Sequence, residues 1–568
     1  MRHRSVWAFA GLGLILTIVA EGLAPRAIAR AIDDGIAAGD TATLAGFAVL
    51  AAGLWLMRGL FGAAFGFCNH YGAQLVGRDL RNLYFAALNR MSFTYFDRNN
   101  SGDLITRGIS DVQSASHGGT MSFLLLTEAV GKYAFFATLM LTTNFKLALA
   151  TMAMVPIMVF WTLYFGRIFR TQWRAVMRQR SVLTDVLTEV LNGIRVVKAF
   201  AQEDRETQRF EDEVHEMVRA ILRAIRSFSI FLPALFFMSS IGTVVLIWYG
   251  FSLVSAGEAL IGDVVSFNIY MGALIQPTRM MGAFVQRLIN GIVATDRVFE
   301  IIDYSPPEPD ELPPPERVPH GLEVVFDDVW FRYSSGADWI LRGVSFVAPV
   351  GSTVGIIGPT GSGKTSLLNL LLRHYRPDRG RILIGGRPLD EFDAKELRWQ
   401  ISAVPQDPYL FTNTVSKNVS FARPDSDIRR IEAAADSAQV GRFINTLPDR
   451  YETVVGERGV GLSGGQRQRV TIARALVMDA PILVMDDSTS SVDTETERLI
   501  QLSIDRQLAG RTALLVSQRV SSVSAADQIL VLENGQITAR GTHRELLEDG
   551  GLYAEIYRLQ SPPAEVST

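Results

Sequence analysis

A short glycine-rich segment in the C-terminal half has the residue types and spacing needed to bind phosphate. It is the run Gly358, Pro359, Thr360, Gly361, Ser362, Gly363, Lys364, Thr365 and Ser366. Glycines let backbone N–H groups curl around a phosphate, and the N-terminus of a following helix adds a favourable field. Lys364 is expected to reach the β- and γ-phosphates of a nucleotide, and Thr365 to place its hydroxyl on Mg²⁺. The segment therefore predicts a site for ATP with Mg²⁺.

The residues around this loop supply the context that a phosphate loop requires. Residues 353–357 form an apolar run typical of a buried strand, and residues 366–368 begin a helical pattern. A second apolar run, 482–485, ends in Asp486, whose carboxylate is suited to holding the metal or its water shell. Further strand-like segments lie at 322–326, 512–516 and 528–532. Their alternation with helical segments predicts a parallel sheet with crossover helices.

Composition indicates that a membrane half precedes this nucleotide-binding half in the chain. The chain has 568 residues, enough for two sizeable domains, and 48% of them are hydrophobic, with a mean hydropathy of +0.19. The apolar residues are crowded before about residue 303. A net charge of −3 gives no basic surface for nucleic acid. A single cysteine, Cys68, excludes disulfides within the chain and thiolate metal clusters.

The apolar residues fall into runs that are long enough to cross a membrane as helices. They lie near 6–28, 43–68, 118–143, 145–168, 228–254 and 260–284. Each approaches the ~20 residues that a membrane-spanning helix needs. The Arg-rich stretches 72–117 and 169–227 are expected to continue as helices into the cytosol, where basic residues stay. Six spans return the chain to its starting side, so we expect a multi-pass protein of a bacterial inner membrane with a cytosolic ATP-binding half.

The N-terminal apolar run has a second interpretation. Arg2 and Arg4 precede residues 6–20, a pattern that also suits a secretory signal. A secretory signal would carry the nucleotide-binding half out of the cytosol, away from ATP. We therefore interpret this run as the first membrane span.

Several ionisable residues lie inside the predicted spans, among them Glu21, Arg58, Glu128 and Lys132. A charge at membrane depth is costly, so it usually pairs with another charge or faces a wet cavity with a function. Glu128 and Lys132 are one helical turn apart and could neutralise each other. Structural pairing and contact with a substrate both remain open.

The run Leu462, Ser463, Gly464, Gly465 and Gln466 gives the C-terminal half a family. With the phosphate loop and Asp486 in this order, residues 322–560 resemble the ATPase domain of an ABC transporter. Residues 1–302 resemble the membrane half of exporter-type (type IV) members. The expected fold is an α-helical membrane bundle of six transmembrane helices with long cytosolic extensions, followed by an α/β P-loop ATPase domain. We expect the boundaries 1–303 for the bundle, 304–320 for a Pro-rich connector, 321–560 for the ATPase domain and 561–568 for a tail.

The resemblance implies roles for further residues. Tyr333 is expected to stack on adenine, and Gln406 to sense Mg²⁺ and the membrane half. Residues 491–493 form the expected D-loop, with Asp493 at the nucleotide. Residues 453–457 are expected to face the membrane half. Two cytosolic coupling segments are expected at about 93–103 and 195–204.

Two departures from the family pattern concern hydrolysis itself. Asp487 stands where the family carries a catalytic Glu, and Gln518 stands where it carries a switch His. Asp487 is one methylene shorter, so its oxygens should fall short of the attacking water. Gln518 can donate a neutral hydrogen bond to the γ-phosphate but supplies no positive charge. Both changes in one half-site predict slow hydrolysis there.

These features together predict one half of a heterodimeric ABC exporter. Family ATPase domains pair head to tail, so Ser463, Gly464, Gly465 and Gln466 would bind ATP held by a second, non-identical half-transporter. Hydrolysis at that partner-dominated site would drive transport. A drug, lipid or peptide is compatible with the apolar bundle, which also contacts membrane lipid. Two alternatives are an ATP-gated regulatory or channel-like membrane protein and an importer that uses the exporter fold.

Overall fold

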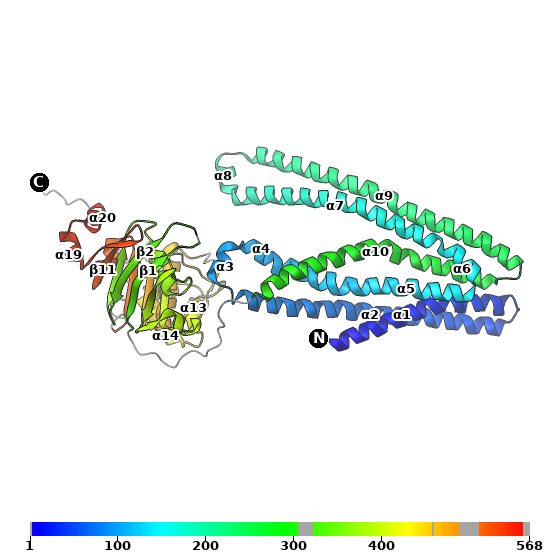
Figure 1. The fold of residues 1–568 in the computed structure, drawn as a ribbon, viewed down its shortest axis with the longest axis horizontal. Helices are drawn as coiled ribbons and strands as arrows, with labels where there is room; N and C mark the ends of the chain where they lie inside the picture. The colour runs from blue at the N-terminus through cyan, green and yellow to red at the C-terminus, as the bar shows by residue number, and fades with distance from the viewer. Residues whose placement is uncertain are drawn as a thin grey trace. The chain divides into compact units, whose positions relative to one another are not determined.

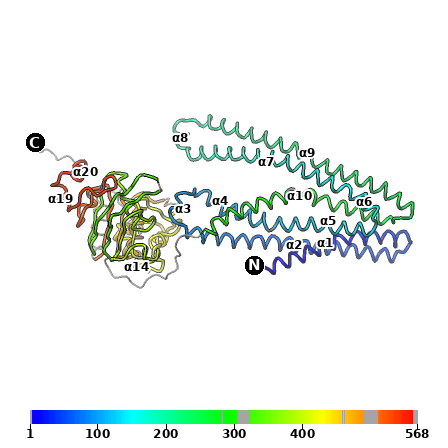
Figure 2. Tube along the Cα trace, in the orientation of Figure 1, coloured from blue at the N-terminus to red at the C-terminus, as the bar shows by residue number. Residues whose placement is uncertain are grey.

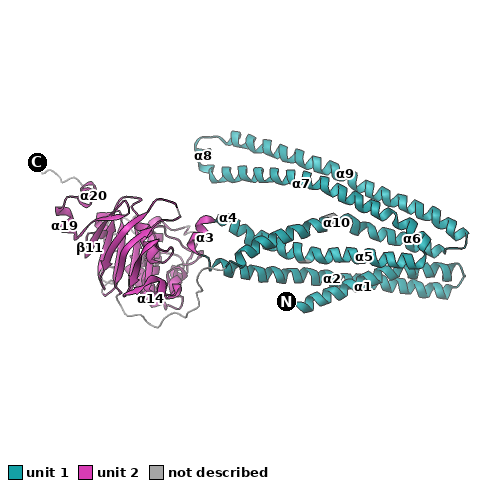
Figure 3. Ribbon diagram, viewed as in Figure 1, with its two compact units in different colours: residues 1–91, 99–305 teal, residues 92–98, 306–568 magenta. Residues whose placement is uncertain are grey.

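The chain divides into two compact units. The computed structural model describes residues 3–304, 322–334, 336–456, 459, 461–487 and 510–560. Unit 1 comprises residues 1–91 and 99–305, and unit 2 comprises residues 92–98 and 306–568 (Figure 3). Apart from Tyr304, the expected connector lies outside the described residues, as does the expected tail.

Unit 1 is built from long helices (Figure 1). The long ones are α1 (Arg4–Arg30), α2 (Thr41–Leu88), α5 (Ser122–Thr143), α7 (Met154–Asn192), α9 (Glu203–Ser255) and α10 (Ile261–Ile302). Shorter pieces are η1 (Ala31–Ile36), α4 (Ser101–Thr106), η2 (Arg107–Asp111), η3 (Ser114–Met121), α6 (Phe145–Met152) and α8 (Ile194–Ala199). The 53 residues of α9 span about 80 Å, well over the ~30 Å of a hydrocarbon core. The longest helices therefore extend beyond any membrane they cross.

Five helical stretches in the described part of the chain are long and apolar enough to span a membrane. They are Arg4–Ile36, Thr41–Leu88, Ser101–Thr143, Phe145–Asn192 and Glu203–Ser255. The sixth apolar run of the sequence falls within α10, which has 42 residues. The predicted helical membrane half is therefore present.

The Arg-rich stretch 169–227 is a helical hairpin, as the sequence predicts. Helix α7 runs out, α8 forms the tip and α9 returns alongside α7 (Figure 2). Stacked rings hold the two long helices together, with Phe165 and Phe231 4.3 Å apart between ring centroids. Farther toward the tip, Gln172 donates to Ser227 at 2.7 Å. Nearer the tip, Arg209 of α9 pairs with Glu189 of α7 at 2.9 Å, so contacts between the two helices continue toward α8.

The four ionisable residues singled out in the predicted spans form one connected cluster. Lys132 on α5 lies 2.8 Å from Glu128 and 3.0 Å from Glu21 of α1. Arg58 on α2 approaches the same Glu21 carboxylate at 3.2 Å. Two positive and two negative charges therefore balance within the packing of three helices. The predicted pairing of Glu128 with Lys132 is confirmed.

Unit 2 combines a mainly parallel sheet with an antiparallel one. The six-stranded sheet has the order β12–β11–β3–β10–β9–β6, in which only β12 pairs antiparallel. Its strands are β3 (Thr353–Ile357), β6 (Ile401–Val404), β9 (Ile482–Asp486), β10 (Thr512–Ser517), β11 (Gln528–Glu533) and β12 (Gln536–Gly541). The antiparallel sheet, ordered β2–β1–β4–β5, comprises β1 (Val324–Phe331), β2 (Leu341–Ala348), β4 (Arg379–Ile384) and β5 (Arg387–Pro388). The predicted parallel sheet is confirmed.

The described part of unit 2 also contains helices and two small strands. The helices are α11 (Lys364–Leu371), α12 (Ala394–Gln400), α13 (Val415–Val419), α14 (Ile428–Ser437), α15 (Gly441–Ile444), α16 (Gly464–Met478), α18 (Val520–Val523), α19 (His543–Glu548) and α20 (Leu552–Gln560). Single turns are η4 (Leu389–Glu391), η5 (Ser420–Ala422) and η6 (Arg450–Glu452), and the two small strands are β7 (Asn413–Thr414) and β8 (Val454–Val455).

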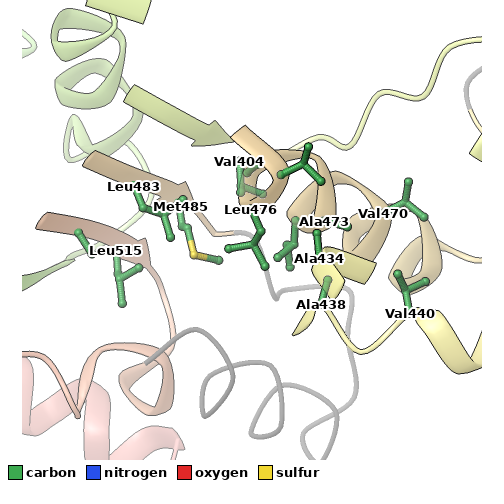
Figure 4. Close-up of a cluster of buried hydrophobic side chains, with 14 of the residues drawn as sticks. Val404, Ala434, Ala438, Val440, Val470, Ala473, Leu476, Leu483, Met485 and Leu515 are labelled. Carbon is green, nitrogen blue, oxygen red and sulfur yellow. The ribbon is translucent and has the colours of Figure 1, made fainter. Parts of the chain in front are cut away.

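The central strands are buried on both faces. Successive side chains of a strand point to opposite faces, so Leu483 and Met485 of β9 pack with α16 and α14, as Figure 4 shows. Their neighbours Ile482 and Val484 join the other core, which contains α11 and the antiparallel sheet. Burial on both faces explains why these strands are continuous apolar runs in the sequence. This buried layer carries the loops of the predicted nucleotide site.

One short helix outside the C-terminal half also belongs to unit 2. It is α3 (Phe93–Arg98), which follows α2 and precedes α4 (Figure 3). The ring of Phe93 stacks on that of His374, with centroids 3.9 Å apart and an interplanar angle of 25°. Asp97 accepts a hydrogen bond of 2.5 Å from the Tyr375 hydroxyl. The chain therefore leaves unit 1 for seven residues and returns to it.

Replacing Lys132 by Ala should destabilise unit 1 by about 3–5 kcal/mol, because it leaves two carboxylates in the helix packing with reduced compensation. The matched control is Lys146→Ala, whose partner Glu258 lies 2.6 Å away in an exposed pair with side chains 60% and 47% accessible. That control should cost less than about 1 kcal/mol. Melting temperatures of the detergent-purified full chain measure both effects. Equal melting temperatures for the two variants would contradict a stabilising role of the cluster.

Candidate nucleotide site

The phosphate loop connects β3 to α11 at the centre of the parallel sheet. Its shape requires glycine at particular positions. Gly363 has φ +104°, and a Cβ there would meet Leu341 Cδ2 at 2.7 Å. At Gly358 a Cβ would lie 2.0 Å from the carbonyl oxygen of Leu532. Only glycine therefore allows the backbone to pass this close to its neighbours.

Lys364 holds the loop in its present form. Its Nζ atom donates to the carbonyl oxygens of Gly358 and Pro359, each at 2.8 Å. Burial lowers the pKa of Lys364, while Asp486 and Asp487 act in the opposite direction. A buried ammonium group with carboxylates nearby is well placed to exchange these carbonyls for phosphate oxygens.

The loop also contains a buried polar atom without a partner. The Ser362 hydroxyl is buried and makes no hydrogen bond in the described part of the chain. Buried polar groups in proteins are nearly always hydrogen-bonded. An oxygen-rich ligand in the loop would give this hydroxyl an acceptor.

A cavity of about 250 Å³ lies against the loop and brings most of the predicted residues together. Its walls are Tyr333, Ile340, Thr360, Gly361, Gly363, Lys364, Thr365, Ser366, Gln406, Asp486, Asp487, Val516 and Gln518. At one end, the Tyr333 and Ser366 hydroxyls hydrogen-bond at 2.9 Å. Predicted residues from five separate segments therefore line one pocket, together with Ile340 and Val516, which were not predicted.

Oxygen donors suited to a small hard cation gather in this cavity. Thr365, Gln406 and Asp486 all line it. Burial raises the pKa of Asp486, although a hydrogen bond with Thr365 and the charge of Lys364 oppose that rise. Mg²⁺ commonly takes one or two protein carboxylates and completes its shell with phosphates and waters. The donor set fits Mg²⁺ held jointly with a nucleotide.

Asp487 has an unusual backbone conformation at the end of β9. Its φ is +40°, a left-handed value that residues other than glycine rarely adopt. The Asp487 N–H donates to the Val516 carbonyl at 2.8 Å, which joins it to β10. The Ser517 hydroxyl donates to its carboxylate at 3.4 Å. The Asp487 side chain is thus turned toward the end of the neighbouring strand.

Gln518 follows β10 and is held from behind by the last described helix. Its carbonyl oxygen accepts from Gln560 Nε2 at 2.7 Å, and the Val520 N–H donates to Gln560 Oε1 at 2.8 Å. The amide of Gln560 therefore clamps the backbone on both sides of Arg519. Sequence reasoning missed Ser517 and Gln560, because no motif indicates that α20 contacts this loop.

The predicted signature residues begin a helix that is separate from this cavity. Ser463 is the N-cap of α16, and its N–H donates to Gln466 Oε1 at 2.8 Å. The Gln466 N–H in turn donates to Ser463 Oγ at 3.3 Å. This reciprocal capping box leaves the helix N-terminus well formed. The residues that line the cavity, within the part of the chain described, include none of residues 463–466.

Two predicted segments can be assessed only in part. Residues 491–493, with Asp493, lie outside the described residues, and so does Glu457. Residues 453–456 are described, and β8 pairs antiparallel with β7 there. The expected role of each segment stays a prediction.

Comparison with known proteins agrees with the domain order and the pocket. A family model described as ABC transporter transmembrane region matches residues 7–278, and one described as ABC transporter matches residues 341–490. A probable multidrug resistance ABC transporter ATP-binding/permease protein of Bacillus subtilis (strain 168), YheI, is 34% identical, covering 98% of this chain and 96% of that protein. An ATP-dependent lipid A-core flippase of Aromatoleum aromaticum is also 34% identical, covering 93% of this chain and 89% of that protein.

A solved structure extends this likeness to three dimensions. It is a bacterial Atm1-family ABC exporter with ATP bound, with a TM-score of 0.83 and 30% identity over 99% of each chain. The pocket, the order of the two halves and these matches lead to one conclusion. The chain belongs to the ABC transporter family and has the exporter fold, a helical transmembrane domain followed by an ATPase domain.

Proposed function

We propose that this chain is one half of a heterodimeric exporter and contributes the slow half of its ATPase machinery. Lys364, Thr365 and Asp486 would hold ATP and Mg²⁺, with Tyr333 stacked on the adenine. Mg²⁺ would neutralise charge on the β- and γ-phosphates. The ATPase domain would lie in the cytosol of a bacterial cell, beneath a bundle in the inner membrane.

The observation that carries the proposal is that Asp487 and Gln518 line the same cavity as Lys364. A general base must come within hydrogen-bond reach of the attacking water, and Asp487 has a short side chain bonded to Ser517. Gln518 offers a neutral amide where a cationic group would stabilise developing charge more strongly. The cavity therefore contains the groups that ATP binding needs, but Asp487 and Gln518 are poorly suited to activate the attacking water.

The intact signature supplies the other half of the argument. The formed N-terminus of α16 has the dipole and N–H groups that favour an anion, yet its capping residues lie outside the walls of the cavity that contains Lys364. A second ATPase domain would bring its own nucleotide to Ser463. Hydrolysis would then depend on a partner chain that carries Glu and His at the two altered positions.

The cargo is expected to be hydrophobic or amphipathic. A multidrug resistance transporter and a lipid A-core flippase are both about one-third identical to this chain, which supports a drug or a lipid, and a peptide also suits an apolar bundle. Sealed vesicles distinguish export from the alternatives. ATP-dependent accumulation in inside-out vesicles supports export, accumulation in right-side-out vesicles supports import, and equilibration without accumulation supports a channel-like protein.

The altered residues should limit turnover in the full chain purified by itself. The double variant Asp487→Glu with Gln518→His should raise ATPase activity by about tenfold to a hundredfold, because a displacement of ~1 Å at the attacking water can cost the latter factor. Steady-state phosphate release measures this gain. Adding Lys364→Ala to the double variant should abolish it, which shows that the gain arises at this site. An unchanged rate in the double variant would contradict the proposed roles of Asp487 and Gln518.

Substitutions in the phosphate loop and in the signature should lower the ATPase activity of the assembled transporter by different amounts. The complex is purified from the source organism through a tag on this chain, and a second, different ABC half-transporter should accompany it in equal amount. Ser463→Arg should then lower ATPase activity more than tenfold, because a bulky cation in the signature blocks a site that carries the larger share of catalysis. Lys364→Ala should lower it less. The reverse order, or recovery of this chain alone, would count against a partner-dominated site.

A further inference from the structure

Two residues that follow the phosphate-loop helix contact other parts of unit 2. His374 and Tyr375 follow α11, the helix that begins at Lys364. Both contact α3, through the Phe93–His374 ring stack at 3.9 Å and the Tyr375–Asp97 hydrogen bond at 2.5 Å. Helix α3 lies in the segment between α2 and α4 of unit 1. The backbone therefore joins α3 directly to helices of the other unit.

Tyr375 also contacts the tyrosine expected to bind the base. Its ring meets Tyr333 edge to face, with centroids 5.0 Å apart and an interplanar angle of 89°. Phe331 completes the cluster at 4.9 Å from Tyr333 and 5.7 Å from Tyr375. The Tyr333 hydroxyl is fixed to Ser366 at 2.9 Å, so the ring orientation is held at the cavity wall. Edge-to-face pairs have a preferred geometry, so rotation of one ring displaces the other.

The groups on either side of this contact have fixed protonation. Burial, and then the hydrogen bond with Asp97, raise the pKa of Tyr375, so its hydroxyl remains a donor. Burial and the charge of Arg398 lower the pKa of His374 to about 4, so its ring stays neutral against Phe93. Asn369 of α11 positions His374. The Asn369 Oδ1 atom lies 3.2 Å from His374 Nδ1, and the Asn369 backbone carbonyl accepts from the His374 N–H at 2.9 Å. The contact of His374 with α3 is thus anchored to the phosphate-loop helix, and Tyr375 is the next residue of the chain.

We propose that Tyr375 is a positioning residue that connects the base-binding Tyr333 to Asp97, so that bound adenine changes how firmly unit 2 holds α3. This inference rests on the proposed stacking of adenine on Tyr333. It adds a base-sensing contact to the ATP site, separate from the roles expected of Lys364 at the phosphates and of Gln406 at Mg²⁺. Adenine on Tyr333 restricts that ring, the ring restricts Tyr375, and the hydroxyl of Tyr375 secures the carboxylate of Asp97.

Hydrogen exchange of the full chain in lipid nanodiscs tests the connection. Exchange is measured by mass spectrometry for the peptide containing residues 92–98, without nucleotide, with ATP and Mg²⁺, and with inorganic tripolyphosphate and Mg²⁺. ATP should slow exchange in this peptide about tenfold or more, the size expected for one firmly made hydrogen bond to a charged group. Tripolyphosphate should not, because it lacks the base. Equal effects of the two ligands, or no effect of ATP, would overturn the proposal.

Variants separate this role from simple packing. Tyr375→Phe keeps the ring but removes the hydroxyl, so ATP should bind with nearly unchanged affinity while its effect on residues 92–98 is lost. Asp97→Ala should have the same effect, and the double variant should be no worse than either single one. The matched control is Tyr553→Phe, which removes a hydroxyl bonded to His543 at 2.6 Å and should leave the ATP effect intact. A full ATP effect in Tyr375→Phe contradicts the proposal.

The adenine site itself has an independent readout. Tyr333→Ala should weaken ATP binding, measured by displacement of a fluorescent ATP analogue, while leaving tripolyphosphate binding unchanged. Unchanged ATP affinity in Tyr333→Ala would refute the proposed base site, whatever the behaviour of Tyr375→Phe. Weakened affinity in Tyr333→Ala together with a full ATP effect in Tyr375→Phe would refute only the connection.

Discussion

Two hydrogen bonds from Lys364 to carbonyl oxygens of its own loop determine how the nucleotide site can receive a phosphate. A buried ammonium group must be compensated, and here the backbone does so. An incoming triphosphate offers stronger, charged acceptors in the same place. The glycines keep the loop open enough for that exchange, and the unpartnered Ser362 hydroxyl gains an acceptor in it. Nucleotide binding would therefore replace hydrogen bonds within the loop as well as occupy the cavity.

The two carboxylates next to this loop have different surroundings. Asp486 is buried beside Thr365 and suits a metal, whereas Asp487 is turned toward Ser517 in a strained left-handed conformation. Strain of this kind persists where surrounding contacts over-determine it, and here Val516 and Ser517 of β10 supply those contacts. In the proposed function, this site would bind ATP firmly and hydrolyse it slowly. That property suits a transporter in which one nucleotide maintains contact between ATPase domains.

Local patterns in the sequence predicted the parts of the molecule that depend on near neighbours. The phosphate loop, the strand ending in Asp486 and the pairing of Glu128 with Lys132 all follow from spacings of a few residues. Contacts between distant segments could not be predicted in the same way. Nothing in the sequence around Glu21 indicates that Arg58 approaches it, and nothing in α20 indicates that Gln560 holds the backbone beside Gln518. Such contacts are decided by packing, which brings together residues that carry no shared motif.

The seven-residue excursion of the chain into unit 2 affects how the molecule can be divided. A fragment that starts at the connector would contain the whole sheet system but would lack α3. The ring of His374 would lose its stacked neighbour, and the Tyr375 hydroxyl would exchange a carboxylate for water. An isolated ATPase fragment is thus an incomplete version of the folded unit, with an aromatic face newly open to solvent. Its nucleotide affinity and its tendency to associate describe the truncated surface as much as the native one.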